Sequence, residues 1–259
     1  MIENSRKSTK YNTSLMSSLD LKLWYQSPLG QYLLTQIQSR LEPMMSTSFG
    51  YYALQLGCDI EASAITEGCR VKHLFVMGHD PQAVDVQGME TALPIATDST
   101  DMVILMHALS QAQEPHAILR EVNRILIPDG KLVIIDFNPL SLWGLRHLFQ
   151  SWLDDAPWSG HYYSARRLKD WASLLGFELL HDLRCGYVLP LNYQKLINRS
   201  RILSKFSERW LTFSAALNVL VFEKNTIPLT PVRRGWVKRQ ILPPSVVRPS
   251  VGRGMRYDR

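Results

Sequence analysis

The sequence predicts an α/β domain with a mostly parallel sheet flanked by helices, and the middle of the chain carries the evidence. Two apolar runs of strand length, 101–106 and 131–137, lie on either side of an amphipathic stretch at 115–126. Pro115 stands in the first turn of that stretch, and a Pro-Asp-Gly turn at 128–130 follows it. Strand, helix, turn and strand make one right-handed βαβ unit.

Before this unit, the sequence predicts a helix, a buried strand and a short second helix. Apolar residues recur with helical spacing over 29–41, and Pro43 is expected to end that helix. The apolar run 49–56, closed by Gly57, is expected to form a buried strand. Residues 59–66 have the composition of a short helix.

The second and third strand candidates, 73–77 and 83–87, are atypical because only a five-residue turn, 78–82, separates them. A parallel crossover needs roughly a dozen residues or more, so these strands cannot be parallel neighbours with a helix between them. We expect either a hairpin or one strand that has left the sheet.

After the βαβ unit, helical patterns cover 140–153 and 164–175, and the second helix is capped by Ser164 and ended by Gly176. The last strands are expected at 177–185 and 215–223, with a helical stretch at 193–210 between them. The final strand is expected to be antiparallel to its neighbour in the sheet.

Length and composition favour one soluble domain with two polar extensions. A chain of 259 residues suits a single α/β domain, here 21–225, after a flexible arm at 1–20. The N-terminus has no secretory signal and no apolar run reaches membrane-spanning length, so we expect a cytoplasmic protein. Cys58, Cys69 and Cys185 follow no metal or disulfide spacing, which favours buried, reduced thiols and no metal site.

The tail, 226–259, holds most of the positive charge. It has eight basic residues, one acid and five prolines, so it is expected to be disordered, while the rest of the chain is close to neutral. Such a tail is suited to contact nucleic acid or an anionic membrane surface. The alternative is a solvated extension without a partner.

Several landmarks between residues 88 and 137 keep a recognisable order and spacing. They are Gly88–Ile95, Asp98–Asp101, the strand up to Leu109, Pro115, Leu119–Leu126, Pro128–Gly130 and Leu132–Phe137. This stretch of about fifty residues resembles the core of S-adenosylmethionine (SAM)-dependent methyltransferases of the type 11 group, which have the class I, Rossmann-like fold. Upstream, Ala53-Leu-Gln-Leu-Gly-Cys-Asp59 resembles a degenerate form of that family's first glycine motif. The runs 138–141 and 144–146 and the basic tail are similar to those of a group of bacterial members.

The resemblance implies SAM as cofactor and assigns candidate ligands near the first strand. Gly57 would let the backbone approach the amino-acid portion of SAM, although a glycine can equally end a buried strand. Gln55 stands where the family usually has an acid facing the SAM ammonium. Asp59 would replace that acid, or would instead cap the following helix.

Further along, the resemblance places Met89 and Glu90 beside the adenine. The family's acid is expected at Met89, whereas here it stands one residue later, and neighbouring residues of a strand point to opposite faces. Glu90 is therefore either an adenine ligand or a surface acid.

The end of the fourth strand supplies the remaining candidates. Met106 and His107 would line the pocket for cofactor and acceptor, with His107 as a base near neutral pH or as a buried histidine satisfied by the backbone. Asp136 and Asn138 follow the next strand; they would touch the acceptor, or Asn138 would form a turn with Pro139.

Two hypotheses about function remain open. The chain lacks the second and third glycines of the family's loop, and Met77-Gly78 replaces the acid that binds the SAM ribose, with Asp80 the nearest substitute. It is therefore either a SAM-dependent methyltransferase with an atypical pocket and an unidentified small-molecule acceptor, or a catalytically inactive binding module of the same fold. The segment 140–159, with Trp143, Trp152 and Trp158, is a candidate lid over an apolar acceptor, unless these tryptophans belong to the core. A dehydrogenase is rejected because no G-x-G-x-x-G follows the first strand.

Overall fold

The computed structural model describes residues 20–58, 60, 70–78, 85–150, 157, 160–188 and 215–225. The chain divides into two compact units, Met1–Thr226 and Ile227–Arg259, and all described residues belong to the first. Several sequence-based expectations therefore lie outside the described residues. They are the arm up to residue 19, the helix at 61–66, Asp59, Cys69, Asp80, Trp152, Trp158, the helical stretch at 193–210 and the tail 226–259.

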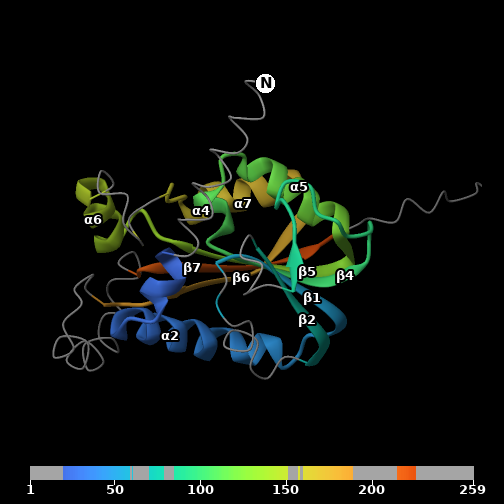
Figure 1. Ribbon diagram of the computed structural model, residues 1–259, viewed down its shortest axis with the longest axis horizontal. Coiled ribbons are helices and arrows are strands. Elements are labelled where there is room, and N and C mark those ends of the chain that lie inside the picture. The colour runs from blue at the N-terminus through green and yellow to red at the C-terminus, as the bar shows by residue number, and fades with distance from the viewer. Residues whose placement is uncertain are drawn as a thin grey trace, which may run out of the picture. The chain divides into compact units, whose positions relative to one another are not determined.

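Within the described residues, seven strands form one mixed sheet in the order β3-β2-β1-β4-β5-β7-β6 (Figure 1). The strands are β1 (Phe49–Gly57), β2 (Arg70–Gly78), β3 (Val86–Gln87), β4 (Thr100–Met106), β5 (Leu126–Phe137), β6 (Phe177–Cys185) and β7 (Leu217–Lys224). The pairings among β1 to β5 are all parallel, whereas β7 runs antiparallel to both β5 and β6. This arrangement confirms the predicted Rossmann-like α/β fold with an antiparallel last strand.

Helices cover both faces of the sheet (Figure 1). On one face, α2 (Pro28–Met45) packs with its buried side chains against β1, β4, β5 and β7. On the other face lie α4 (Ala108–Gln111), α5 (Pro115–Ile125) and α7 (Ala165–Leu174), while α6 (Leu142–Gln150) follows β5. Strand β4 and the second half of β5, which lie between these layers, are nearly continuous apolar runs, as parallel strands buried on both faces require.

The pairing of β2 with β3 corrects one expectation. The two strands are neither a hairpin nor separated but parallel neighbours, with Met77 beside Val86 and Gly78 beside Gln87. The chain needs no long crossover because β3 starts level with the end of β2 and pairs with its last two residues only. Asp85 supports the junction, since its backbone N–H donates to the Val76 carbonyl and its carboxylate accepts from the Val76 N–H, both at 2.9 Å.

Two element boundaries also differ from expectation. Pro43 does not end α2, which continues to Met45, and the helix is capped at its start by Ser27, whose hydroxyl accepts from the Gly30 N–H. The turn predicted at 128–130 lies inside β5, which already pairs with β4 at Leu126; Asp129 adopts a φ of +61° there, and the register shifts between Thr100 and Met102.

The described cysteines and helices agree with the remaining expectations. Cys58 and Cys185 are buried and form no disulfide with each other, as predicted. Within the part of the chain that the structure describes, no helix is both long and apolar enough to cross a membrane.

Candidate active site

The carboxyl ends of β1 and β4 meet at one edge of the sheet. Gly57 pairs with Met106, and the Cys58 N–H donates to the Met106 carbonyl at 2.8 Å. Because parallel strands end at the same edge, this pairing places Gln55, Gly57, Met106 and His107 together. The short strand β3 ends at the same edge but on the far side of β2.

Gly57 is required by packing at this edge. Its φ is +98°, and a Cβ at this position would collide with the Met106 carbonyl and lie 2.8 Å from the Ala108 nitrogen. The absence of a side chain therefore lets β1 and β4 lie close together, which agrees with the interpretation of Gly57 as a glycine that ends a buried strand.

Gln55 links the end of β1 to the turn that follows. Its side chain is fully buried, and its amide nitrogen donates to the carbonyls of Cys58 and Ile60, each at 3.0 Å. Its amide oxygen, Oε1, is buried without a hydrogen-bond partner among the described residues. An unsatisfied buried acceptor is costly, so this oxygen marks a position where a donor is missing.

Met89 and Glu90 lie in a turn after β3. The Ala92 N–H donates to the Met89 carbonyl at 2.9 Å, and the same two residues form an isolated antiparallel bridge. Because neither residue belongs to a strand, the expected alternation of faces does not apply to them. Met89 is 49% exposed and Glu90 is partly exposed, so the edge of the sheet leaves them at the surface.

His107 belongs to a buried group of three ionisable side chains. It adopts a left-handed backbone conformation, with φ +57°, immediately after β4 and before α4. The Tyr25 hydroxyl lies 2.7 Å from His107 Nε2, and Asp136 Oδ1 lies 3.4 Å from His107 Nδ1. All three side chains are at most 2% exposed.

The electrostatics of this group keep the Tyr25 hydroxyl protonated. Burial, and then the neighbouring Cys58, Cys185, Asp136 and Tyr162, raise the pKa of Tyr25 well above its usual value. The Tyr25 hydroxyl therefore stays protonated, and it lies within hydrogen-bond distance of His107 Nε2, while His107 Nδ1 faces Asp136. The 3.4 Å separation is an ion-pair distance without hydrogen-bond geometry, and both Asp136 oxygens lack a hydrogen-bond partner among the described residues.

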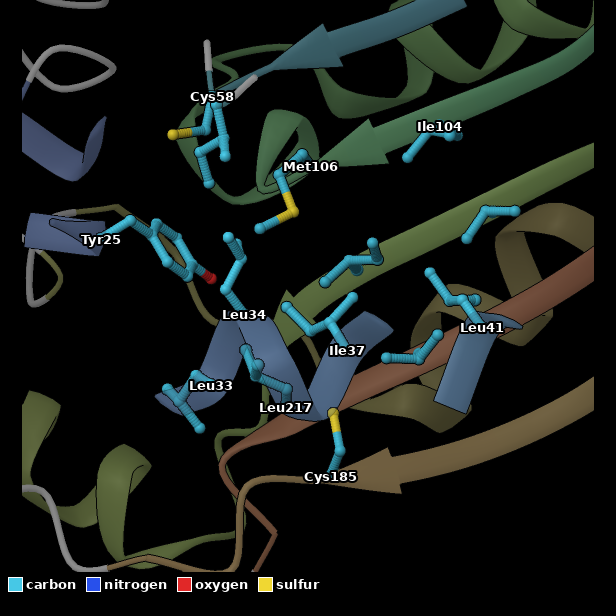
Figure 2. Packing of buried hydrophobic residues seen from close by; sticks show 14 of the residues in the cluster. Tyr25, Leu33, Leu34, Ile37, Leu41, Cys58, Ile104, Met106, Cys185 and Leu217 are labelled. Atoms are coloured by element: carbon cyan, nitrogen blue, oxygen red, sulfur yellow. The ribbon is translucent and has the colours of Figure 1, made fainter. Parts of the chain in front are cut away.

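Tyr25 is the residue that sequence reasoning missed. Leu21 and Tyr25 are one helical turn apart, just before the apolar face of α2, and both are 2% exposed. This spacing was the available signal, but nothing local indicates that the ring would reach a residue 82 positions away. Figure 2 shows Tyr25 beside the start of α2, near Cys58 at the end of β1 and Met106 at the end of β4.

The crevice expected at this edge is closed by the chain's own side chains. Gln55, Met106 and His107 are each at most 1% exposed, and Tyr25 lies among them. Among the described residues, these side chains leave no opening at the end of β1.

Beyond β5, a groove of about 1130 Å³ opens between α6 and the segment before α7. Its lining residues are Pro139, Leu140, Ser141, Leu142, Gly144, Leu145, His147, Leu148, Gly160, His161, Tyr162, Tyr163 and Arg167. Four leucines give the groove an apolar wall. Trp143 is fully buried, and its indole N–H donates to the Val188 carbonyl at 2.8 Å, so this tryptophan belongs to the core and not to a lid.

Stacked rings connect the groove to the buried group. Tyr162 stacks on Phe137 with ring centroids 5.2 Å apart, and Phe137 stacks on His107 at 4.4 Å. Burial, and then Asp136, raise the pKa of Tyr162 above its usual value. Asn138 forms a turn, as the structural alternative predicted, since the Leu140 N–H donates to its side-chain oxygen at 3.1 Å.

Comparisons with known proteins agree with the fold. The model of the methyltransferase domain family matches residues 51–182, just over half of the chain. The uncharacterized protein YafS of Escherichia coli K12 is 34% identical over 222 residues, covering 84% of this chain and 88% of YafS. A demethylmenaquinone methyltransferase of Renibacterium salmoninarum is 34% identical over 68 residues, covering 26% of this chain and 29% of its own. A SAM-dependent methyltransferase structure from Thermotoga maritima superposes with a TM-score of 0.57 at 14% identity, covering 76% of this chain and 92% of its own.

The chain belongs to the methyltransferase domain family, with the class I fold of SAM-dependent methyltransferases. The type 11 resemblance is consistent with this assignment.

The residues at the edge fit SAM in one specific respect. The unsatisfied Gln55 Oε1 is an acceptor at the position where the family faces the SAM ammonium, and an ammonium carries donors only. Asp59, the other candidate at this position, lies outside the described residues.

Proposed function

We propose that this protein transfers a methyl group from SAM to an apolar small molecule bound in the groove beside α6. The continuous stack from Tyr162 in the groove through Phe137 to His107 supports this proposal. This stack runs from the groove to His107 and Asp136 at the ends of β4 and β5. Open α/β sheets bind their ligands at these strand ends.

The cofactor side of the proposal involves the end of β1 and the turn after β3. Gln55 Oε1 would accept a hydrogen bond from the SAM ammonium, and the backbone after Gly57 would pass close to the amino-acid portion of SAM. Glu90 would bind the adenine. Met106 would line the pocket wall between cofactor and acceptor. When bound, SAM supplies an electrophilic methyl group, and methyl transfer depends mainly on alignment and on exclusion of water.

His107 is proposed as the base for an acceptor that must lose a proton. In the closed structure its Nε2 is occupied by the Tyr25 hydroxyl, so the same ring closes the edge and masks the base. Displacement of Tyr25 would open the crevice and free Nε2 in one step. Asp136 Oδ1 would remain 3.4 Å from Nδ1, on the other side of the same ring.

Apolar side chains of the groove support an apolar acceptor. Leu140, Leu145 and Leu148 are 70%, 52% and 67% exposed, and exposed leucines on one wall gain free energy when an apolar ligand covers them. Arg167 and His161 at the same groove would orient a polar end of that ligand.

A thermal-shift titration with SAM and its demethylated product tests the cofactor site. A ligand that binds only the folded state stabilises it by roughly 2.7 kcal/mol at a hundredfold excess over Kd. We expect a clear rise in Tm for the wild type and a smaller rise for Gln55→Leu, each measured against the same protein without ligand. Phe149→Ala, a substitution on the exposed surface of α6, is the matched control and should respond like the wild type.

A catalytically inactive binding module is the second candidate, and the closed edge favours it. Tyr25→Ala separates the two functions because it removes the ring that blocks entry. If neither the wild type nor Tyr25→Ala responds to millimolar SAM, the methyltransferase proposal fails. A response that appears only in Tyr25→Ala would show that the pocket exists but stays closed in the wild type.

A further inference from the structure

The first halves of β1 and β2 project beyond the rest of the sheet. Phe49 to Tyr52 pair with β2, whereas β4 joins β1 only from Ala53 onward, and β3 reaches only the last two residues of β2. We call residues 49–52 and 70–75 the aromatic ribbon. On its inner edge, the Asp101 carboxylate accepts from the N–H groups of Tyr51 and Tyr52, both at 2.9 Å, and so replaces the missing strand.

The aromatic ribbon exposes large rings, which is unusual for parallel strands. Such strands are normally buried on both faces. Here Phe49, Tyr51, Tyr52 and Phe75 are 70%, 65%, 46% and 37% exposed. Connections of only 12 and seven residues, 58–69 and 79–85, follow β1 and β2. A contiguous set of exposed rings on a sheet usually marks a binding surface.

Three exposed rings on one face lie close together with nearly parallel planes. Tyr52 and His73 are partners in the β1–β2 register, and Phe75 follows two residues later on the same face. The centroid distances are 5.7 Å for Tyr52–His73, 6.2 Å for Tyr52–Phe75 and 6.3 Å for His73–Phe75, with planes within 30° of each other.

Cations accompany the rings on the opposite face. The Arg70 guanidinium lies 5.3 Å from the centre of the Phe49 ring, and the Lys72 ammonium lies 6.0 Å from that of Tyr51. Both side chains are exposed and belong to β2, which is the outer strand of the ribbon. The outer strand of the ribbon, β2, therefore carries the positive charge.

We propose that the aromatic ribbon binds single-stranded nucleic acid. Bases would stack on Tyr52, His73 and Phe75, and the phosphate backbone would follow Arg70 and Lys72 along the outer strand. Stacking on aromatic rings combined with a cationic track is the usual recognition of single strands without sequence readout. A planar bilayer fits less well, because it can cover only one face of the ribbon while both faces carry rings. The ribbon lies at the opposite ends of the strands from the candidate active site, so this proposal does not depend on methyl transfer.

Fluorescence anisotropy with labelled 12-nucleotide oligo(dT) and oligo(U) tests the proposal on the full-length protein. Loss of one stacking ring costs about 1.4 kcal/mol, a tenfold loss of affinity, so Tyr52→Ala and Phe75→Ala should each bind about tenfold more weakly. Tyr52→Phe keeps the ring and should bind like the wild type. Arg70→Ala with Lys72→Ala should weaken binding and flatten its dependence on salt, by roughly 0.7 in the log–log slope for each phosphate that is no longer neutralised.

Matched controls separate the ribbon from the rest of the surface. Phe149→Ala removes an exposed ring from α6, Arg166→Ala removes an exposed cation from α7, and all variants retain the basic tail. Unchanged far-UV circular dichroism would establish that each variant is folded. Ribbon variants that bind oligonucleotides as well as the controls do would overturn the proposal. It would also be overturned if the protein bound only vesicles of phosphatidylcholine with 30% phosphatidylglycerol.

Discussion

Gly57 turns the chain at the end of β1 directly against the backbone of β4. An L-residue in this left-handed conformation costs roughly 1–2 kcal/mol, and the contact with the Ala108 backbone, which cannot rotate away, adds to that cost. We therefore predict that Gly57→Ala lowers the free energy of unfolding by at least about 2 kcal/mol, measured by urea denaturation. Because the substitution disturbs folding, it is a poor probe of cofactor binding. A variant with wild-type stability would mean that the β1–β4 contact relaxes easily.

Cys185 carries a thiol that burial makes unreactive. Burial raises the pKa of its thiol to about 12, and only the thiolate is an effective nucleophile. In a protein that carries Cys69→Ser, we predict no reaction of Cys58 or Cys185 with Ellman's reagent at pH 8 until denaturant is added. Two equivalents should then react. Rapid reaction of the native protein would show that one thiol is accessible.

At the scale of elements, α5 anchors the segment that follows β3. The Arg124 guanidinium donates to the carbonyls of Leu93 and Ile95, at 3.0 and 2.8 Å, while Glu121 accepts from the Leu93 N–H at 3.0 Å. Glu121 and Arg124 also form an ion pair at 2.8 Å. These contacts explain physically why an acid and an arginine stand three residues apart in this helix.

This anchor predicts a dependence of stability on pH. Hydrogen bonds from Arg124, and then from the Leu93 backbone, lower the pKa of Glu121 below its ordinary value of 4.5. A lowered pKa in the folded state contributes stability that is complete above the ordinary value and is lost as the pH falls through the folded value. Glu121→Gln should therefore be less stable than the wild type at neutral pH, and the difference should shrink below pH 4.5. Urea unfolding at several pH values measures it; a constant difference would contradict the assignment.

Lys224 joins β7 to the end of α5. Its ammonium, largely buried, donates to the carbonyls of Asn123 and Leu126 and to Asp98. Lys224→Met would leave buried acceptors unsatisfied, and we predict a loss of roughly 3 kcal/mol in the free energy of unfolding. Lys169→Met, which breaks an exposed pair with Asp182, is the control and should cost under about 1 kcal/mol. Equal losses in the two variants would refute the role given to Lys224.

Sequence reasoning succeeded where the determinants are local. The spacing of Ile118, Leu119 and Val122 predicts α5, and the Ser164 cap and Gly176 bound α7, because helix periodicity and capping involve neighbouring residues. It failed where the geometry of distant strands decides. The β2–β3 register cannot be read from loop length alone, and the contact of Tyr25 with His107 depends on how α2 packs on the whole sheet.

At the scale of the whole molecule, the sheet is completed only by the last described segment. β7 lies between β5 and β6, although 31 residues separate the end of β6 from its start, and Val219, Leu220 and Phe222 are at most 1% exposed. Without β7, β6 has no partner strand, and β5 presents an open, apolar edge. Folding of the domain therefore depends on a strand near its C-terminal end.

Two truncated chains test this dependence. Burial of a large apolar side chain contributes roughly 1.5–3 kcal/mol, so loss of the four buried residues 219–222 exceeds much of a domain's typical stability of about 5–15 kcal/mol. We predict that a chain ending at Ser214 shows no cooperative unfolding transition in urea. A chain ending at Asn225 should unfold with the midpoint of the full-length protein, because the predicted domain, 21–225, keeps every strand. Far-UV circular dichroism during the titration measures both. A cooperative transition in the chain ending at Ser214 would mean that β1, β2, β4 and β5 form a stable core without β7. A lowered midpoint in the chain ending at Asn225 would mean that residues 226–259 contribute to the stability of the fold.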